Sequence, residues 1–204
     1  MIWEIYKMID LAPYKFSALI FDCDGTLAHT APLHFISMRE ALGAQGYPLT
    51  RAWYFERVGL SRHDLFEDYQ KCYGVPVDVE AASRVSQDVY ADHVKDAQPV
   101  PEVVAVAKAY FGKMPMIVAS GGERHLVLAS LVAIGVSDMF SQTVTRCDVA
   151  NGKPAPDIFL EAAKRLQTPP SECLVFEDSS EGLEAASRAG MQAIDVRPFI
   201  TAAS

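Results

Sequence analysis

Short apolar runs alternate with amphipathic segments over most of the chain. Buried strands are predicted where consecutive apolar or β-branched residues end in polar residues or glycine, at 18–20, 116–119, 143–145, 173–176 and 193–196. Between these runs, apolar positions three or four apart predict helices near 103–110, 127–134, 159–166 and 183–186. Strands that alternate with helices indicate an α/β fold, a doubly wound parallel sheet with helices on both faces.

The alternation stops after the first strand. From about residue 31 to residue 96 the pattern predicts helices only, with shared apolar faces formed by Leu65, Tyr69 and Cys72 and by Val85 and Val89. We therefore predict an all-helical cap domain, residues 31–97, inserted into a catalytic core made of residues 1–30 and 98–204. The two connections between these units would act as a hinge.

Composition narrows the classes of partner. A net charge of −8 over 204 residues argues against nucleic acid or an anionic membrane surface, and no apolar run approaches membrane-spanning length. The four cysteines are scattered, without a Cys-x-x-Cys pair, which suits reduced thiols in the cytoplasm. Glu4, Lys7 and Asp10 interrupt the apolar residues of the N-terminus, so this segment does not resemble the apolar region of a signal peptide. We expect it to be a short lead-in that packs against the core. We also expect the protein to be cytoplasmic and a monomer.

Two carboxylates follow the first predicted strand. Asp22 and Asp24 are one residue apart, and Gly25 then allows a sharp turn. Ligands of open α/β sheets bind beyond the carboxyl ends of the strands, although Asp and Gly are also ordinary turn residues. Because side chains alternate along extended chain, Cys23 should face away from the two acids, into the core.

Three further polar groups follow other strands. Ser120 precedes Gly121 and Gly122, Lys153 precedes a predicted helix, and Glu177-Asp178 follows the fourth predicted strand. Taken singly, these features have structural alternatives: a turn, a solvated surface lysine and a helix cap. Because they all meet at one edge of the predicted sheet, we interpret them as one site.

The residue types suit phosphoryl transfer. Asp22 can attack phosphorus as a nucleophile, and Asp24 can protonate the leaving oxygen and later deprotonate water. Mg²⁺ prefers oxygen ligands, which Asp22, the backbone carbonyl of Asp24, and Asp178 would supply, with Glu177 as a further ligand or a support.

The anion would be held on the other side of the site. Ser120 and the amides of Gly121 and Gly122 lie at a predicted helix start, where anions bind readily. Lys153 adds a positive charge for the phosphoryl oxygens.

In the order and wording of these motifs, the chain resembles the haloacid dehalogenase-like superfamily. The motifs are 22–26, Ser120, Lys153 and Glu177-Asp178, and the resemblance runs from Ser17 to Val196. The stretches 152–159 and 175–179 are similar to the β-phosphoglucomutase-like branch, whose layout sugar-phosphate phosphatases share. The resemblance implies a Rossmann-like core with a helical cap, the residue roles given above, and Mg²⁺ as the cofactor. It also implies a phosphate-binding or substrate-binding place for Thr26.

In the cap, residues 58–62 resemble the substrate-specificity loop of that branch. Arg62 would then reach a distal anion or hydroxyls of the substrate; the alternative is an exposed arginine at a helix start. His34 is placed near the domain junction, either in the active site or as a packing residue.

The chain also departs from the mutases. Glu123-Arg124 stands where related mutases have Lys and Asn, Val58 stands where they have Lys, and His29 stands where an acid is usual. The sequence therefore favours a phosphatase of a small phosphorylated metabolite, with a β-phosphoglucomutase-like isomerase as the alternative. A dehalogenase would need neither Mg²⁺ nor Asp24, and a non-catalytic binding protein would not need the complete set of motifs. Which metabolite is the substrate does not follow from the sequence.

Overall fold

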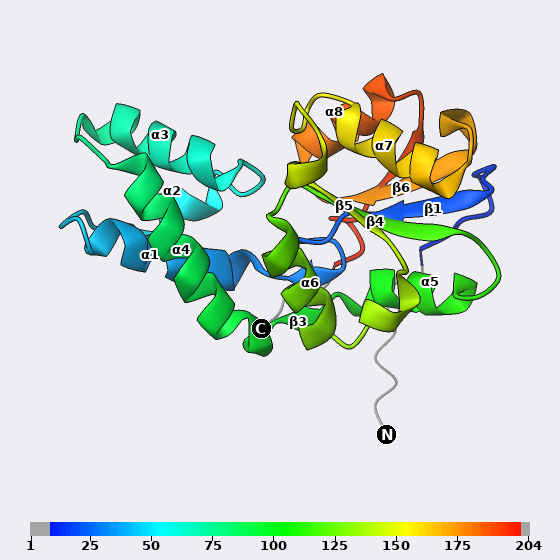
Figure 1. Cartoon of the computed structure of the whole chain (residues 1–204), viewed down its shortest axis with the longest axis horizontal. Coiled ribbons are helices and arrows are strands. Elements are labelled where there is room, and N and C mark those ends of the chain that lie inside the picture. Colours follow the sequence, from blue (N-terminus) through cyan, green and yellow to red (C-terminus); the bar gives the residue numbers. More distant parts are fainter. Residues whose placement is uncertain (1–8, 201–204) are drawn as a thin grey trace.

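The computed structural model describes residues 9–200, and its core is a five-stranded parallel sheet in the order β5-β4-β1-β6-β7 (Figure 1). Every neighbouring pair in this sheet is parallel. The strands are β1 (Ala18–Phe21), β4 (Met116–Ser120), β5 (Thr143–Thr145), β6 (Cys173–Glu177) and β7 (Gln192–Asp195). All five predicted strands are confirmed, each within one residue of its expected bounds. The central place of β1 puts the residues that follow it in the middle of the sheet edge.

Helices cover both faces of the sheet (Figure 1). Leu19 and Phe21 of β1 pack with α5 (Pro101–Tyr110) and α6 (Arg124–Ala133). Ala18 and Ile20 pack with α7 (Asp157–Leu166) and α8 (Ser180–Arg188) on the opposite face. This division follows from the alternation of side chains along a strand, and it confirms the doubly wound α/β fold. Single 3-10 turns also occur, at η2 (Ser137–Met139), η3 (Arg146–Asp148) and η4 (Pro170–Glu172).

The stretch after β1 is a cap of helices beside the carboxyl edge of the sheet (Figure 1). It consists of α1 (Ala31–Gly43), α2 (Arg51–Phe55), α3 (Arg62–Tyr73) and α4 (Val79–His93), followed by η1 (Val94–Asp96). The cap has an apolar cluster of its own, centred on residues such as Met38, Leu42, Phe66 and Tyr69. The helical content predicted for this stretch is therefore confirmed.

Two short strands connect the cap to the core. β2 (Ala28–His29) pairs antiparallel with β3 (Gln98–Pro99), and His29 lies opposite Gln98. The two connections are predicted from the sequence but their pairing is not, because two residues are too few to show a strand pattern. We propose that this pair is the hinge and that the domain boundaries lie beside it, after residue 30 and before residue 98.

Two predicted details of packing are corrected. Cys72 does not share the buried face of Leu65 and Tyr69: it is exposed in the last turn of α3, where its thiol contacts Asp68. The buried face of α4 consists of Ala82, Ser86 and Tyr90, whereas Val85 and Val89 lie half-buried at its margins. In both helices, a side chain is buried when it faces a neighbouring helix, whether it is apolar or polar. Ser86 is buried for this reason.

The lead-in packs on the core where the structure describes it. Ile9 is buried, and Leu11, Tyr14 and Phe16 pack against the same apolar cluster as β1. The part of this prediction that concerns residues 1–8 lies outside the described residues. Within residues 9–200, no helix has both the length and the apolar character needed to cross a membrane.

Candidate active site

The chain leaves β1 with its two acids on the open edge and the intervening thiol in the core. The amide of Asp22 donates to the carbonyl of Phe176, so the parallel ladder continues up to the first acid. Cys23 is 0% exposed and packs within the apolar cluster, which confirms its predicted orientation. Asp22 is also buried, whereas the side chain of Asp24 keeps 29% of its surface exposed. The two carboxylates therefore have different surroundings, as different chemical roles require.

Lys153 joins two strand ends. Its Nζ lies 2.6 Å from Asp22 Oδ1 and 2.6 Å from Glu177 Oε2. Its side chain is only 12% exposed, so the alternative of a solvated surface lysine does not hold. Burial lowers the pKa of Lys153, but the charges of Asp22 and Glu177 raise it by more, so the ammonium stays charged. The loop after β5 thus delivers a fixed positive charge next to the predicted nucleophile.

Three carboxylates crowd around that lysine. Asp22, Glu177 and Asp178 offer oxygen atoms that all lie within 4.8 Å of one another. Burial, and then the charge of Glu177, raise the pKa of Asp22 above its ordinary value and raise the pKa of Asp178 to about 7. One lysine cannot balance two buried acids and one half-buried acid, so the cluster has surplus negative charge and spare oxygen ligands. This donor set fits a hard divalent cation such as Mg²⁺.

The oxygens of the cluster are not equally available. Glu177 Oε1 accepts from the amide and the hydroxyl of Ser179, at 3.0 and 2.7 Å, while its Oε2 is taken by Lys153. Asp178 uses Oδ1 to accept from Thr26, at 3.0 Å, and its Oδ2 has no hydrogen-bond partner among the described residues. Asp22 and Asp178 are therefore the side chains best placed to hold a cation, and Glu177 supports Lys153 and the start of α8.

Two glycines make room for these acids. A Cβ on Gly25, whose φ is +83°, would lie 2.0 Å from Asp178 Oδ2. A Cβ on Gly182 would lie 2.1 Å from the carboxyl carbon of Glu177. Both distances are far below contact, so each carboxylate occupies the space that a side chain would fill. Gly25 was singled out by the sequence analysis as a turn, whereas the role of Gly182 was missed.

The carboxylate of Asp24 is held by groups other than the acidic cluster. His34 Nε2 lies 3.2 Å from Asp24 Oδ1, and Ser120 Oγ lies 3.4 Å from Asp24 Oδ2. The amide of Gly122 donates to Ser120 Oγ at 3.1 Å. Burial raises the pKa of Asp24, but the hydrogen bond and charge of His34 act against it, and the net pKa is about 2. The side chain of Asp24 is thus turned toward the cap, away from the cation ligands.

A cavity of about 750 Å³ lies between the core and the cap. Every site residue predicted from the sequence lines it except Thr26, which is buried beneath the site and gives its hydroxyl to Asp178. The structure therefore places Thr26 where it positions an acid, not where it meets a ligand. Residues from the cap that line the cavity include His34, Tyr54 and Arg62, and the core adds Arg146 beyond the end of β5.

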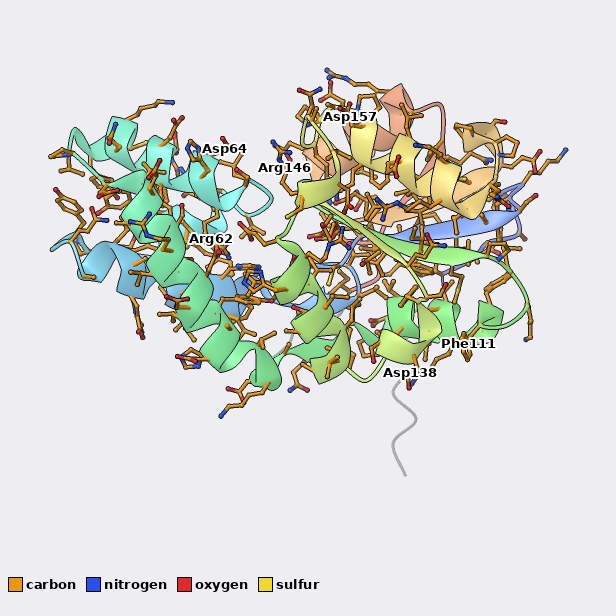
Figure 2. All side chains as sticks on the ribbon, viewed as in Figure 1. Arg62, Asp64, Phe111, Asp138, Arg146 and Asp157 are labelled. Carbon is orange, nitrogen blue, oxygen red and sulfur yellow. The ribbon has the colours of Figure 1, made fainter. Side chains whose placement is uncertain are left out.

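Arg62 reaches from the cap into this cavity. Its side chain is 11% exposed and bridges Ser86 Oγ, 3.0 Å from Nε, and Glu123 Oε2, 2.8 Å from Nη1. Figure 2 shows Arg62 and Asp64 on the cap and Arg146 on the core. All three line the cavity. The alternative of a fully exposed helix-start arginine is wrong. Neither Glu123 as the partner of Arg62 nor the presence of Arg146 and Tyr90 in the cavity is predicted from the sequence pattern.

The chain is similar to proteins of one known hydrolase family. Residues 16–190 match the family model described as haloacid dehalogenase-like hydrolase. The chain is 34% identical to the fructose-1-phosphate phosphatase YqaB of Escherichia coli over 184 residues, 90% of this chain and 97% of that protein. It is 29% identical to the phosphorylated carbohydrates phosphatase of Thermotoga maritima, over 87% of this chain and 83% of that protein.

Among solved structures, that of CbbY from Rhodobacter sphaeroides, in complex with phosphate, matches with a TM-score of 0.77 and 24% identity. The match covers 87% of this chain and 84% of that one. At this level of identity, the match shows a shared fold of core and cap.

Proposed function

The chain belongs to the haloacid dehalogenase-like hydrolase family, and on that premise we propose that it is a Mg²⁺-dependent phosphatase. Its substrate is a small phosphorylated metabolite, a sugar phosphate by analogy with the relatives named as phosphatases of fructose 1-phosphate and of phosphorylated carbohydrates. The observation that carries the proposal is the position of Lys153, whose ammonium group lies 2.6 Å from Asp22 Oδ1 beside a cluster of three acids.

In the first step, a carboxylate oxygen of Asp22 forms a bond to phosphorus while the bond from phosphorus to the leaving oxygen breaks. Asp24 gives its proton to that oxygen, so the substrate leaves as a neutral alcohol and Asp22 carries the phosphoryl group. Asp24 has to be protonated for this step. The approaching anionic substrate acts in that direction, because a like charge raises the pKa of Asp24 from its value of about 2 in the free site.

In the second step, Asp24 takes a proton from water, which attacks phosphorus and releases inorganic phosphate from Asp22. Ser120, the amides that follow it, and Lys153 hold the phosphoryl oxygens throughout. Asp22 and Asp178 would hold Mg²⁺, with the backbone carbonyl of Asp24 as a further ligand. The ion supplies charge that lets a carboxylate approach a phosphate and that stabilises the transferring group.

The cap completes the site by covering it. Tyr90 on α4 hydrogen-bonds Ser130 on α6 at 2.9 Å, and His34 on α1 reaches Asp24. These contacts hold the cap against the core. A covered cavity excludes bulk water, which strengthens the charge interactions inside it.

The test is release of inorganic phosphate from a panel of sugar phosphates and p-nitrophenyl phosphate, with Mg²⁺ and with EDTA. Turnover that needs Mg²⁺ and is reduced by roughly a thousandfold or more in Asp22→Asn is expected. Circular dichroism checks that the variant is folded. Absence of metal-dependent turnover from every compound would overturn the proposal, and formation of an isomeric sugar phosphate in place of phosphate would favour the isomerase alternative.

A further inference from the structure

The cavity contains one ion pair that the proposed chemistry does not use. Arg62 of the cap and Glu123 of the core meet at 2.8 Å, and both line the cavity that contains Asp22 and Asp24. Glu123 follows the Ser120-Gly121-Gly122 turn directly and is the N-cap residue of α6. It therefore lies between the proposed phosphoryl-binding loop, which precedes it, and the cap, which it contacts through Arg62.

Both oxygens of Glu123 are occupied by cap residues. Oε2 accepts from Arg62, and Oε1 accepts from the side-chain amide of Gln87 on α4, at 3.2 Å. On the other side, the Nε of Arg62 is taken by Ser86. The guanidinium is thus held by a fixed carboxylate and a hydroxyl, and Nη2 is the group of Arg62 that keeps donor capacity without a hydrogen-bond partner among the described residues.

Charge in the remainder of the cavity points the same way. Apart from the proposed catalytic and metal-binding side chains, and with the histidines counted as neutral, the charged residues that line it within 9–200 are three carboxylates and two guanidiniums: Asp64, Glu123, Glu181, Arg62 and Arg146. This part of the cavity therefore has no surplus positive charge for a second anion. A neutral, hydroxyl-bearing group can still accept from Arg62 and donate to the carboxylates.

We propose that Glu123 is a specificity-determining residue that restricts the enzyme to monophosphates with an uncharged, hydroxylated leaving group. A second phosphate would have to displace Glu123 from Arg62 or lie beside the half-buried carboxylate of Glu123. Like charges at such distances repel in a partly desolvated cavity. This inference rests on the proposed phosphatase activity and adds the class of leaving group.

The experiment compares fructose 1-phosphate with fructose 1,6-bisphosphate in the wild type, Glu123→Gln and Glu181→Gln. Both variants remove one negative charge from the same cavity, but only Glu123 contacts Arg62. The wild type should favour the monophosphate in kcat/KM by roughly tenfold or more. In Glu123→Gln, the bisphosphate-to-monophosphate ratio should rise by roughly tenfold, mainly through a lower KM for the bisphosphate, and it should rise clearly less in Glu181→Gln.

The possible outcomes separate this inference from the proposed function. Turnover of p-nitrophenyl phosphate by the wild type reports the phosphatase chemistry by itself, because that compound carries no second anion. If the wild type hydrolyses it but uses the bisphosphate as well as the monophosphate, the inference is wrong and the proposed function stands. The same holds if the two variants raise the ratio equally. Because the wild-type preference is measured independently, the test does not depend on the folding of either variant.

Discussion

The imidazole of His34, on the first cap helix, lies 3.2 Å from the carboxylate of Asp24, on the core. One face of the ring stacks on Tyr90, with the two ring centroids 4.4 Å apart and the planes inclined by 22°. Tyr90 in turn hydrogen-bonds Ser130 of the core. The proposed acid and base is thus contacted directly by the cap, which links closure of the cavity to the position of the carboxylate that moves the proton.

Replacing His34 by Ala should lower kcat/KM for a sugar phosphate by roughly tenfold, because it removes a hydrogen bond to a charged group. The effect is expected because Asp24 loses the contact that fixes its carboxylate and the cap loses part of its hold on the core. Steady-state kinetics of phosphate release measure it. His125→Ala is the matched control, since His125 is exposed on α6 and does not line the cavity. Equal activities of the two variants would contradict the role given to His34.

Mg²⁺ should raise the melting temperature of the wild type, and Asp178→Asn should remove most of that rise. A cation that binds the folded chain alone stabilises it by mass action, which at saturating Mg²⁺ corresponds to roughly 4 °C or more. In EDTA the variant should have a higher melting temperature than the wild type, because one of the three neighbouring carboxylates has been replaced by a neutral amide.

Thermal unfolding with Mg²⁺, with EDTA, and with sodium chloride at matched ionic strength distinguishes these effects. Sodium chloride should not reproduce the rise in melting temperature, since it does not supply a divalent cation for Asp22 and Asp178 to coordinate. A variant with the same Mg²⁺ response as the wild type would show that Asp178 is not a ligand.

Gly182→Ala should destabilise the fold by roughly 1–3 kcal/mol and reduce turnover, because the new Cβ would lie 2.1 Å from the carboxyl carbon of Glu177. Either Glu177 or the first turn of α8 must shift, and Glu177 is what holds Lys153. Gly43→Ala, at the end of α1, is the control: a Cβ there meets nothing within 4 Å. That substitution should be neutral or stabilising by up to about 1 kcal/mol. Urea unfolding measures both, and equal effects of the two substitutions would refute the close fit around Glu177.

Much of the core and of the proposed catalytic set was predictable from the sequence for one physical reason. Fully buried parallel strands read as consecutive apolar residues, and the polar residue that ends such a run marks the edge of the sheet. Asp22, Ser120 and Glu177 all carry that signal, and the structure brings them to one cavity. Lys153 carried a weaker signal, because its place depends on how the loop after β5 folds back.

The features that could not be predicted from the sequence depend on contacts between distant segments. The Arg62–Glu123 pair joins residues 61 positions apart across the two units, and neither helix pattern contains information about how the cap lies on the core. The direction of the Thr26 hydroxyl depends in the same way on Asp178, 152 residues later. Cys72 was placed on a buried face because periodicity shows which residues share a face, but not where along the helix the neighbouring surface ends.

Asp148 joins the helices of both faces at the edge of the sheet, and its contribution to stability should depend on pH. Its carboxylate accepts from Thr145, from Arg124 of α6 and from Arg165 of α7, the last at 2.9 Å. Burial raises the pKa of Asp148, but the hydrogen bonds from Arg165 and Thr145 outweigh it, so its pKa lies below the ordinary value. A lowered pKa in the folded state means that the charged form stabilises the fold.

We therefore expect Asp148→Asn to lower the free energy of unfolding by about 2 kcal/mol at neutral pH. The difference should stay constant from pH 7 to about pH 5. It should shrink as the pH falls through the ordinary carboxyl value near 3.9, where the unfolded wild type takes up the proton that the folded state resists. Urea unfolding at pH 7, 5, 4 and 3.5 measures it, with Asp138→Asn, an exposed aspartate on η2, as the control. A difference that did not change between pH 5 and pH 3.5 would mean that the ion pairs of Asp148 do not contribute to stability through its charge.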